Sequence, residues 1–71
     1  MPAEPVHLPE RSSFRGILYD VIECDGLALA CLGHLIIEVP KELAPELRAL
    51  MGQKTVIGHF DGQHRAGRSS L

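Results

Sequence analysis

Residues 14–39 read FRGILYDVIECDGLALACLGHLIIEV, and this stretch decides the fold. It contains three runs of β-branched, aromatic and aliphatic residues, which is the composition of strands. We expect these strands at residues 14–24, 27–32 and 35–39. Asp25-Gly26 separates the first two runs and is a strong hairpin signal, because both central positions of a type I′ turn need a positive φ. Gly33-His34 separates the last two, as a tight turn or within a four-residue loop. The stretch predicts a three-stranded meander.

The middle of the chain changes to a helical period. Leu43, Leu47 and Leu50 recur at helical spacing, and Gly52 follows at the position where helices commonly end. Because a proline suits the first helical turn, we expect a two-turn helix at residues 45–51.

The remaining pattern completes a mainly β domain. Strands are expected at residues 54–60 and 63–68, joined by a second hairpin turn at Asp61-Gly62. The order β-β-β-α-β-β fits a small five-stranded β-barrel, either OB-like, with the short helix plugging one end, or SH3-like. An open sheet with the helix across one face is the alternative.

The two ends of the chain differ in composition from the centre. Residues 1–13 carry three prolines among charged and small residues and are predicted to be a flexible N-terminal arm. Residues 69–71 are predicted to be a C-terminal tail. Residues 14–68 then form a single small domain, since 71 residues leave room for only one.

Composition limits the classes of function. The chain is 45% hydrophobic and 23% charged, as globular domains are, and its formal net charge is -2. Two cysteines are too few for a disulfide scaffold, and we expect free thiols in a reducing cytoplasm. The N-terminus lacks the pattern of a signal peptide, and no apolar stretch reaches the ~20 residues that cross a bilayer. We expect a cytoplasmic protein without a cofactor.

The expected pairing divides the meander into two faces, both of them apolar. The predicted core face consists of Ile17, Tyr19, Val21, Ala28, Ala30, Leu32, Leu35, Ile37 and Val39, with Tyr19 opposite Leu32. The opposite face consists of Leu18, Asp20, Ile22, Cys24, Leu27, Leu29, Cys31, Ile36 and Glu38. A solvated sheet face should be more polar than this second one. We therefore expect curvature and the final hairpin, a second copy of the chain or another protein to cover it. The predicted partner-binding residues are Ile22, Leu27, Leu29 and Ile36.

Two histidines meet in the second predicted hairpin. A two-residue turn at Asp61-Gly62 places His59 directly opposite His64. Two imidazoles could share a metal if His34 or a cysteine added a third ligand, but no ligand spacing in the sequence supports a site. We assign no metal and expect a partly exposed polar pair on the solvent side of the hairpin.

Basic residues gather toward the end of the chain. Arg15, Lys54, Arg65 and Arg68 would form a local cationic patch if the first and last strands came together, and such a patch can hold a nucleic-acid backbone. The negative net charge and the 4% aromatic content weigh against this hypothesis. A small barrel that binds RNA or single-stranded DNA remains the alternative function.

Residues for catalysis are not apparent in the sequence. It has no catalytic motif or phosphate-binding loop, its serines lie in the two ends, and Asp20 and Glu38 are predicted on strands separated by a third. We expect a non-catalytic interaction module that self-associates or docks on a protein partner. No membrane partner is expected.

Overall fold

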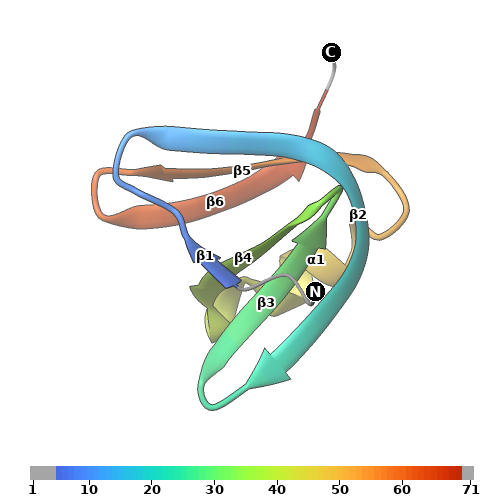
Figure 1. Ribbon diagram of the computed structural model, residues 1–71, viewed down its shortest axis with the longest axis horizontal. Helices are drawn as coiled ribbons and strands as arrows, with labels where there is room; N and C mark the ends of the chain where they lie inside the picture. The colour runs from blue at the N-terminus through green and yellow to red at the C-terminus, as the bar shows by residue number, and fades with distance from the viewer. Residues whose placement is uncertain (1–4, 70–71) are drawn as a thin grey trace.

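The computed structural model describes residues 5–69, which form one mainly β domain (Figure 1). The elements in chain order are β1 (Pro5–His7), β2 (Ser12–Cys24), β3 (Leu27–Leu32), β4 (Leu35–Pro40), the 3-10 helix η1 (Lys41–Leu43), α1 (Ala44–Arg48), β5 (Lys54–Phe60) and β6 (Gln63–Arg68). The mainly β class and the single short helix predicted from the sequence are confirmed. The described strands number six, one more than predicted, and their sheet is not closed into a barrel.

One long strand connects two layers of this sheet. The strand order is β1-β4-β3-β2-β5-β6, with only β1 and β4 parallel. The first half of β2 pairs with β5, and its second half pairs with β3. Figure 1 shows β2 curving from the layer that it forms with β5 and β6 into the layer that it forms with β3 and β4. The core lies between these layers, where α1 also contacts β2 and β6.

The two predicted hairpin turns have the backbone that their sequences favour. Asp25 and Gly26 have φ values of 50° and 80°, and Asp61 and Gly62 have values of 54° and 73°. Positive φ at both central positions is the signature of a type I′ turn. The helical segment begins earlier than predicted, as η1, and α1 ends at Arg48 instead of continuing to residue 51. No helix among the described residues is long and apolar enough to span a bilayer.

Because of a bulge in β2, the side chains that enter the core from this strand differ from those predicted. Leu18 pairs with Leu32 and Asp20 pairs with Cys31, so Tyr19 is the extra residue, and its predicted position opposite Leu32 is wrong. Leu18 is fully buried although the sequence pattern placed it on the opposite face. Ile17 and Tyr19, predicted to be in the core, are exposed.

The bulge lies where β2 changes its partner. The Leu18 backbone is bonded to the loop before β5: its N–H donates to the Gln53 carbonyl at 3.1 Å, and its carbonyl accepts from the Gly52 N–H at 2.7 Å. These hydrogen bonds take the place of the regular β-ladder where the pairing partner of β2 changes from β5 to β3. With its backbone bonded in this way, Leu18 directs its side chain into the core. After the bulge, the predicted pairings of Val21 with Ala30 and of Ala30 with Ile37 are observed.

Part of the predicted N-terminal arm is instead built into the sheet. β1 extends the sheet beyond β4, with Val6 beside Ile37, and Leu8 is fully buried in the core. The prediction of a flexible arm over residues 1–13 is therefore wrong for residues 5–13. Pro5 is compatible with this role because the first residue of an edge strand need not donate to the ladder. Residues 1–4 of the arm and residues 70–71 of the predicted tail lie outside the described range.

Candidate interaction surfaces

The four predicted partner-binding residues share the outer face of the β2-β3-β4 layer. Ile22 pairs with Leu29, and Cys31, two residues further along β3, pairs with Ile36. Ile22 and Leu27 are 45% and 40% exposed, so residues 5–69 cover them only in part, while Leu29 and Ile36 are half-buried. We call Ile22, Leu27, Leu29 and Ile36, together with Tyr19, the apolar face.

Tyr19 is the member of this surface that the sequence pattern missed. The bulge leaves it 58% exposed, and its hydroxyl reaches the Cys31 thiol on the outer side of β3. Burial raises the pKa of the Cys31 thiol, the Asp20 carboxylate raises it further, and the contact with Tyr19 opposes both effects. No sequence signal marks this position, because the bulge depends on contacts with a loop more than thirty residues away.

Two carboxylates flank the apolar face. Asp20 lies on β2 and accepts a hydrogen bond from the Val21 N–H at 2.9 Å, while Glu38 lies beside Leu29 on β4. β3 runs between them, as predicted, so they do not form a carboxylate pair. Near Leu27 the face borders a small hollow of about 110 Å³, lined also by His7, Glu38, Val39, Pro40 and His64.

The predicted opposition of His59 and His64 is confirmed, but their predicted location is wrong. The two residues are paired across β5 and β6, and their rings stack with centroids 4.0 Å apart. They lie on the inner side of the hairpin, since alternate positions along the same strands carry the buried Ile57 and the core-packed Ala66. The alternation of side chains along a strand forces this placement once Ile57 is in the core.

The N-terminal segment packs onto this histidine pair. His7 meets the His59 ring edge-on at 6.4 Å between centroids. The His59 Nδ1 lies 2.8 Å from the Leu8 carbonyl, which can only accept, so this nitrogen carries a proton. Burial lowers the pKa of His64, and the neighbouring His59 and His7 lower it further, against an opposing effect of Glu10. The His64 Nε2 is buried without a hydrogen-bond partner among the described residues.

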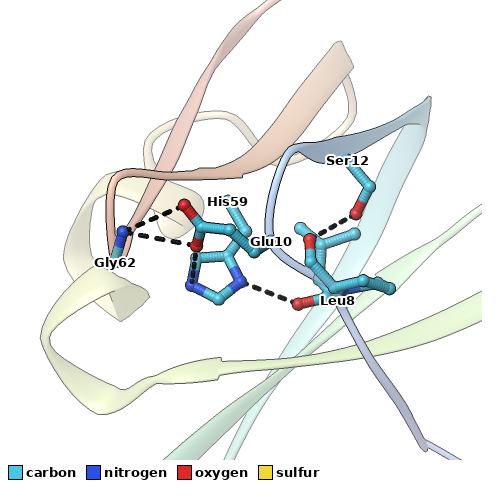
Figure 2. Close-up of polar contacts among 6 residues, drawn as sticks. Leu8, Glu10, Ser12, His59 and Gly62 are labelled. Atoms are coloured by element: carbon cyan, nitrogen blue, oxygen red, sulfur yellow. Dashed lines mark hydrogen bonds and ion pairs between the residues drawn. The ribbon is translucent and has the colours of Figure 1, made fainter.

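Glu10 connects the same segment to the turn between β5 and β6 (Figure 2). Its carboxylate lies 3.2 Å from the His59 Nε2 and accepts from the Gly62 N–H at 3.3 Å. Nearby, the Ser12 hydroxyl donates to the Pro9 carbonyl. Both nitrogens of His59 therefore have partners, and no cluster of three potential metal ligands occurs in residues 5–69. These contacts hold the His59 ring between the N-terminal segment and the turn after β5.

Three of the four predicted cationic residues share the other outer face, that of the β2-β5-β6 layer. Arg15 pairs with Val56, and Arg65 pairs with Gly58, two residues further along β5. These two arginines and Lys54 alternate with residues that face the core, and all three are exposed. Arg68 pairs with the buried Thr55 and so has the opposite orientation in the sheet. We call Arg15, Lys54 and Arg65 the cationic face.

Phe60 adds an aromatic ring to the cationic face. It is 44% exposed and its ring lies over Gly58, so close that a Cβ on that glycine would come within 2.7 Å of the ring. Gly58 is buried, and the Phe60 ring occupies the space that a side chain at this position would need. Sequence reasoning did not assign Phe60 to a site, although the alternation along residues 54–60 places it on the same side as Lys54.

Comparison with known proteins does not add to these observations. Neither the scan of family models nor the searches of curated proteins and of solved structures found a match to this chain.

Proposed function

We propose that this chain is a non-catalytic interaction module that docks on protein through the apolar face. The observation that carries the proposal is that Ile22, Leu27, Leu29 and Ile36, from three strands, form one surface with two large side chains more than a third exposed. Exposed apolar surface of this kind marks interaction sites in proteins. The architecture that we propose for the module is a small β-barrel left open between its edge strands β1 and β6, since β2 already curves through both of its layers.

The occupant that we propose for the apolar face is a second copy of the chain. A two-fold axis near Leu29 would set Ile22 of one copy against the β4 side of the other, and two-fold dimers are the commonest oligomers. Leu29 is central, because it pairs with Ile22 on one side and with Glu38 on the other. A domain of 71 residues buries only about 60% of its unfolded surface, so added burial stabilises it appreciably.

The size of the face predicts how strong such a dimer is. Three strands at about 4.8 Å and six residues at about 3.4 Å give a sheet face of about 14 by 20 Å. The area of this face, about 280 Å², is well below the ~800 Å² per partner of a standard stable interface. We therefore expect a weak dimer that dissociates on dilution, with a dissociation constant in the micromolar range or above.

We also propose that the protein is cytoplasmic and that it is not an enzyme. Both cysteines are free thiols, which is the usual state in a reducing compartment. Asp20 and Glu38, the two carboxylates beside the apolar face, are separated by β3 and so do not form the pair that acid-base catalysis would need. We propose that they lie at the polar rim of the interface.

The proposal is tested by placing a charge in the apolar face. Ile22→Glu and Leu29→Lys should each shift the sedimentation coefficient of a concentrated sample to that of the monomer while the far-ultraviolet circular dichroism stays unchanged. Met51→Glu is the matched control, because Met51 is also exposed and apolar but lies in the loop after α1. Association that survives both variants of the face, or is lost equally in the control, would refute the proposed site.

A further inference from the structure

The three cations of the cationic face lie on the same side of three neighbouring strands, at successive levels of the sheet. Lys54 lies at one level of β5, Arg15 lies beside Val56 at the next level on the same side, and Arg65 lies beside Gly58 at the one after. Each step is two residues, or about 7 Å along the strands. Across the sheet the order is Arg15 on β2, Lys54 on β5 and Arg65 on β6. With about 4.8 Å between strands, the Cα atoms of Lys54 and Arg15 lie about 8 Å apart and those of Arg15 and Arg65 about 12 Å apart.

The surface between these cations is shallow and contains little that would obstruct a chain. Glycines occupy two of its positions, Gly58 on β5 and Gly67 on β6. A hollow of about 350 Å³ is lined by Ser13, Val56, Gly58, Phe60, Arg65, Ala66 and Gly67, and a second of about 180 Å³ is lined by Arg15, Gly16, Ile17, Lys54 and Ser69. Each hollow therefore has at least one cation among its lining residues.

Acidic side chains are absent from β5, from β6 and from the part of β2 that pairs with β5. The chain has nine acidic residues, but none occurs in residues 12–17, in β5 or in β6. The acidic groups closest in sequence are Asp61, in the turn beyond Phe60, and Glu10, which is already engaged by His59 and Gly62. Because charges farther than ~10 Å are largely screened at 0.1 M salt, the net charge of -2 does not cancel this local positive field.

We propose that the cationic face binds single-stranded nucleic acid, with phosphates on Lys54, Arg15 and Arg65 and one base stacked on Phe60. The combination is what sequence-tolerant single-strand binding requires: cations that follow a backbone, and an exposed aromatic ring that accepts any base. The Phe60 ring is already positioned over Gly58, beside Arg65. This site lies on a different layer from the apolar face and does not depend on the function proposed above.

The test measures how salt affects binding of a fluorescein-labelled 15-nucleotide oligothymidylate, followed by fluorescence anisotropy. Three phosphate contacts on a single strand give a slope of log K against log salt of about -2, which is about a 20-fold loss of affinity between about 50 and 200 mM salt. Arg65→Ala should make the slope shallower by about 0.7. Lys41→Ala removes the same charge from η1, away from this face, and should leave the slope unchanged.

A substitution of Phe60 distinguishes the binding of nucleic acid from the binding of other phosphate polymers. Phe60→Ala should weaken oligothymidylate binding by about fivefold or more and leave the binding of inorganic polyphosphate unchanged. Because Phe60 and Arg65 are exposed, both variants should retain the wild-type circular dichroism spectrum. The proposal is overturned if the oligonucleotide does not bind at 50 mM salt, if Lys41→Ala acts as strongly as Arg65→Ala, or if Phe60→Ala has no effect on the oligonucleotide.

Discussion

The bulge in β2 decides which side chains are left for the apolar face, and a pair of alanine substitutions tests it. Leu18 is fully buried, whereas its neighbour Tyr19 is 58% exposed. Replacing a fully buried leucine with alanine costs about 2 to 5 kcal/mol, because apolar contacts are lost and a cavity remains. Replacing an exposed side chain typically costs about 0.5 kcal/mol or less.

These magnitudes are large relative to the stability of so small a domain. At roughly 0.05 to 0.15 kcal/mol per residue, the free energy of unfolding of 71 residues should be about 4 to 11 kcal/mol. Urea denaturation followed by circular dichroism should therefore show Leu18→Ala losing a large fraction of this free energy, while Tyr19→Ala and Ile17→Ala remain near wild type. Uninterrupted pairing without the bulge would place Tyr19 inside, so a larger loss for Tyr19→Ala than for Leu18→Ala would refute the register.

Two further predictions follow from the titrating groups. Because the pKa of His64 is lowered in the folded state, the unfolded chain takes up the proton first, so the free energy of unfolding should decline as the pH falls below about 6.5 and level off below the lowered pKa. Urea unfolding should show a shallower decline for His64→Gln, and a His64 titration by NMR without any depression of the pKa would contradict this. Because Cys31 is buried with a raised pKa and Cys24 is exposed, iodoacetamide should modify Cys24 well before Cys31 in the folded protein. A time course of peptide mass spectrometry measures the modification of each cysteine. Equal rates of modification of Cys24 and Cys31 in the absence of denaturant would contradict the fold.

The strands and turns could be predicted because their signals are local. β3, β5 and β6 have the bounds expected from composition, and Asp25-Gly26 and Asp61-Gly62 form their turns because few other residue pairs accept positive φ twice. The opposition of His59 and His64 followed directly from the second turn.

The features that sequence reasoning missed depend on distant partners. The bulge at Tyr19 exists because the Leu18 backbone bonds to Gly52 and Gln53, and no pattern within residues 14–24 reports that contact. β1 was missed because its three residues and flanking prolines resemble a linker, although pairing with β4 and burial of Leu8 stabilise it. Short edge strands gain their structure from the sheet that they join.

The candidate surfaces were predictable to different degrees. The apolar residues Ile22, Leu27, Leu29 and Ile36 could be grouped from the alternation of the meander, and the pairing brings them together. For the cations, alternation within residues 63–68 already places Arg65 and Arg68 on opposite faces, but the pairing of β5 with β2 and β6 is needed to show that Arg65 is the one that shares a face with Arg15 and Lys54. Which residues of different strands share a face depends on register, which is a tertiary property in this chain.

The solution mass of the wild-type chain, measured by light scattering across a concentration series, tests the proposed function most directly. Dimerisation through the apolar face predicts a mass that rises from the 7.8 kDa monomer toward twice that value as concentration increases through the micromolar range and above. The Ile22→Glu variant should remain at the monomer mass throughout. A wild-type mass that stays at the monomer value at every concentration would contradict self-association and leave another protein as the occupant of the apolar face.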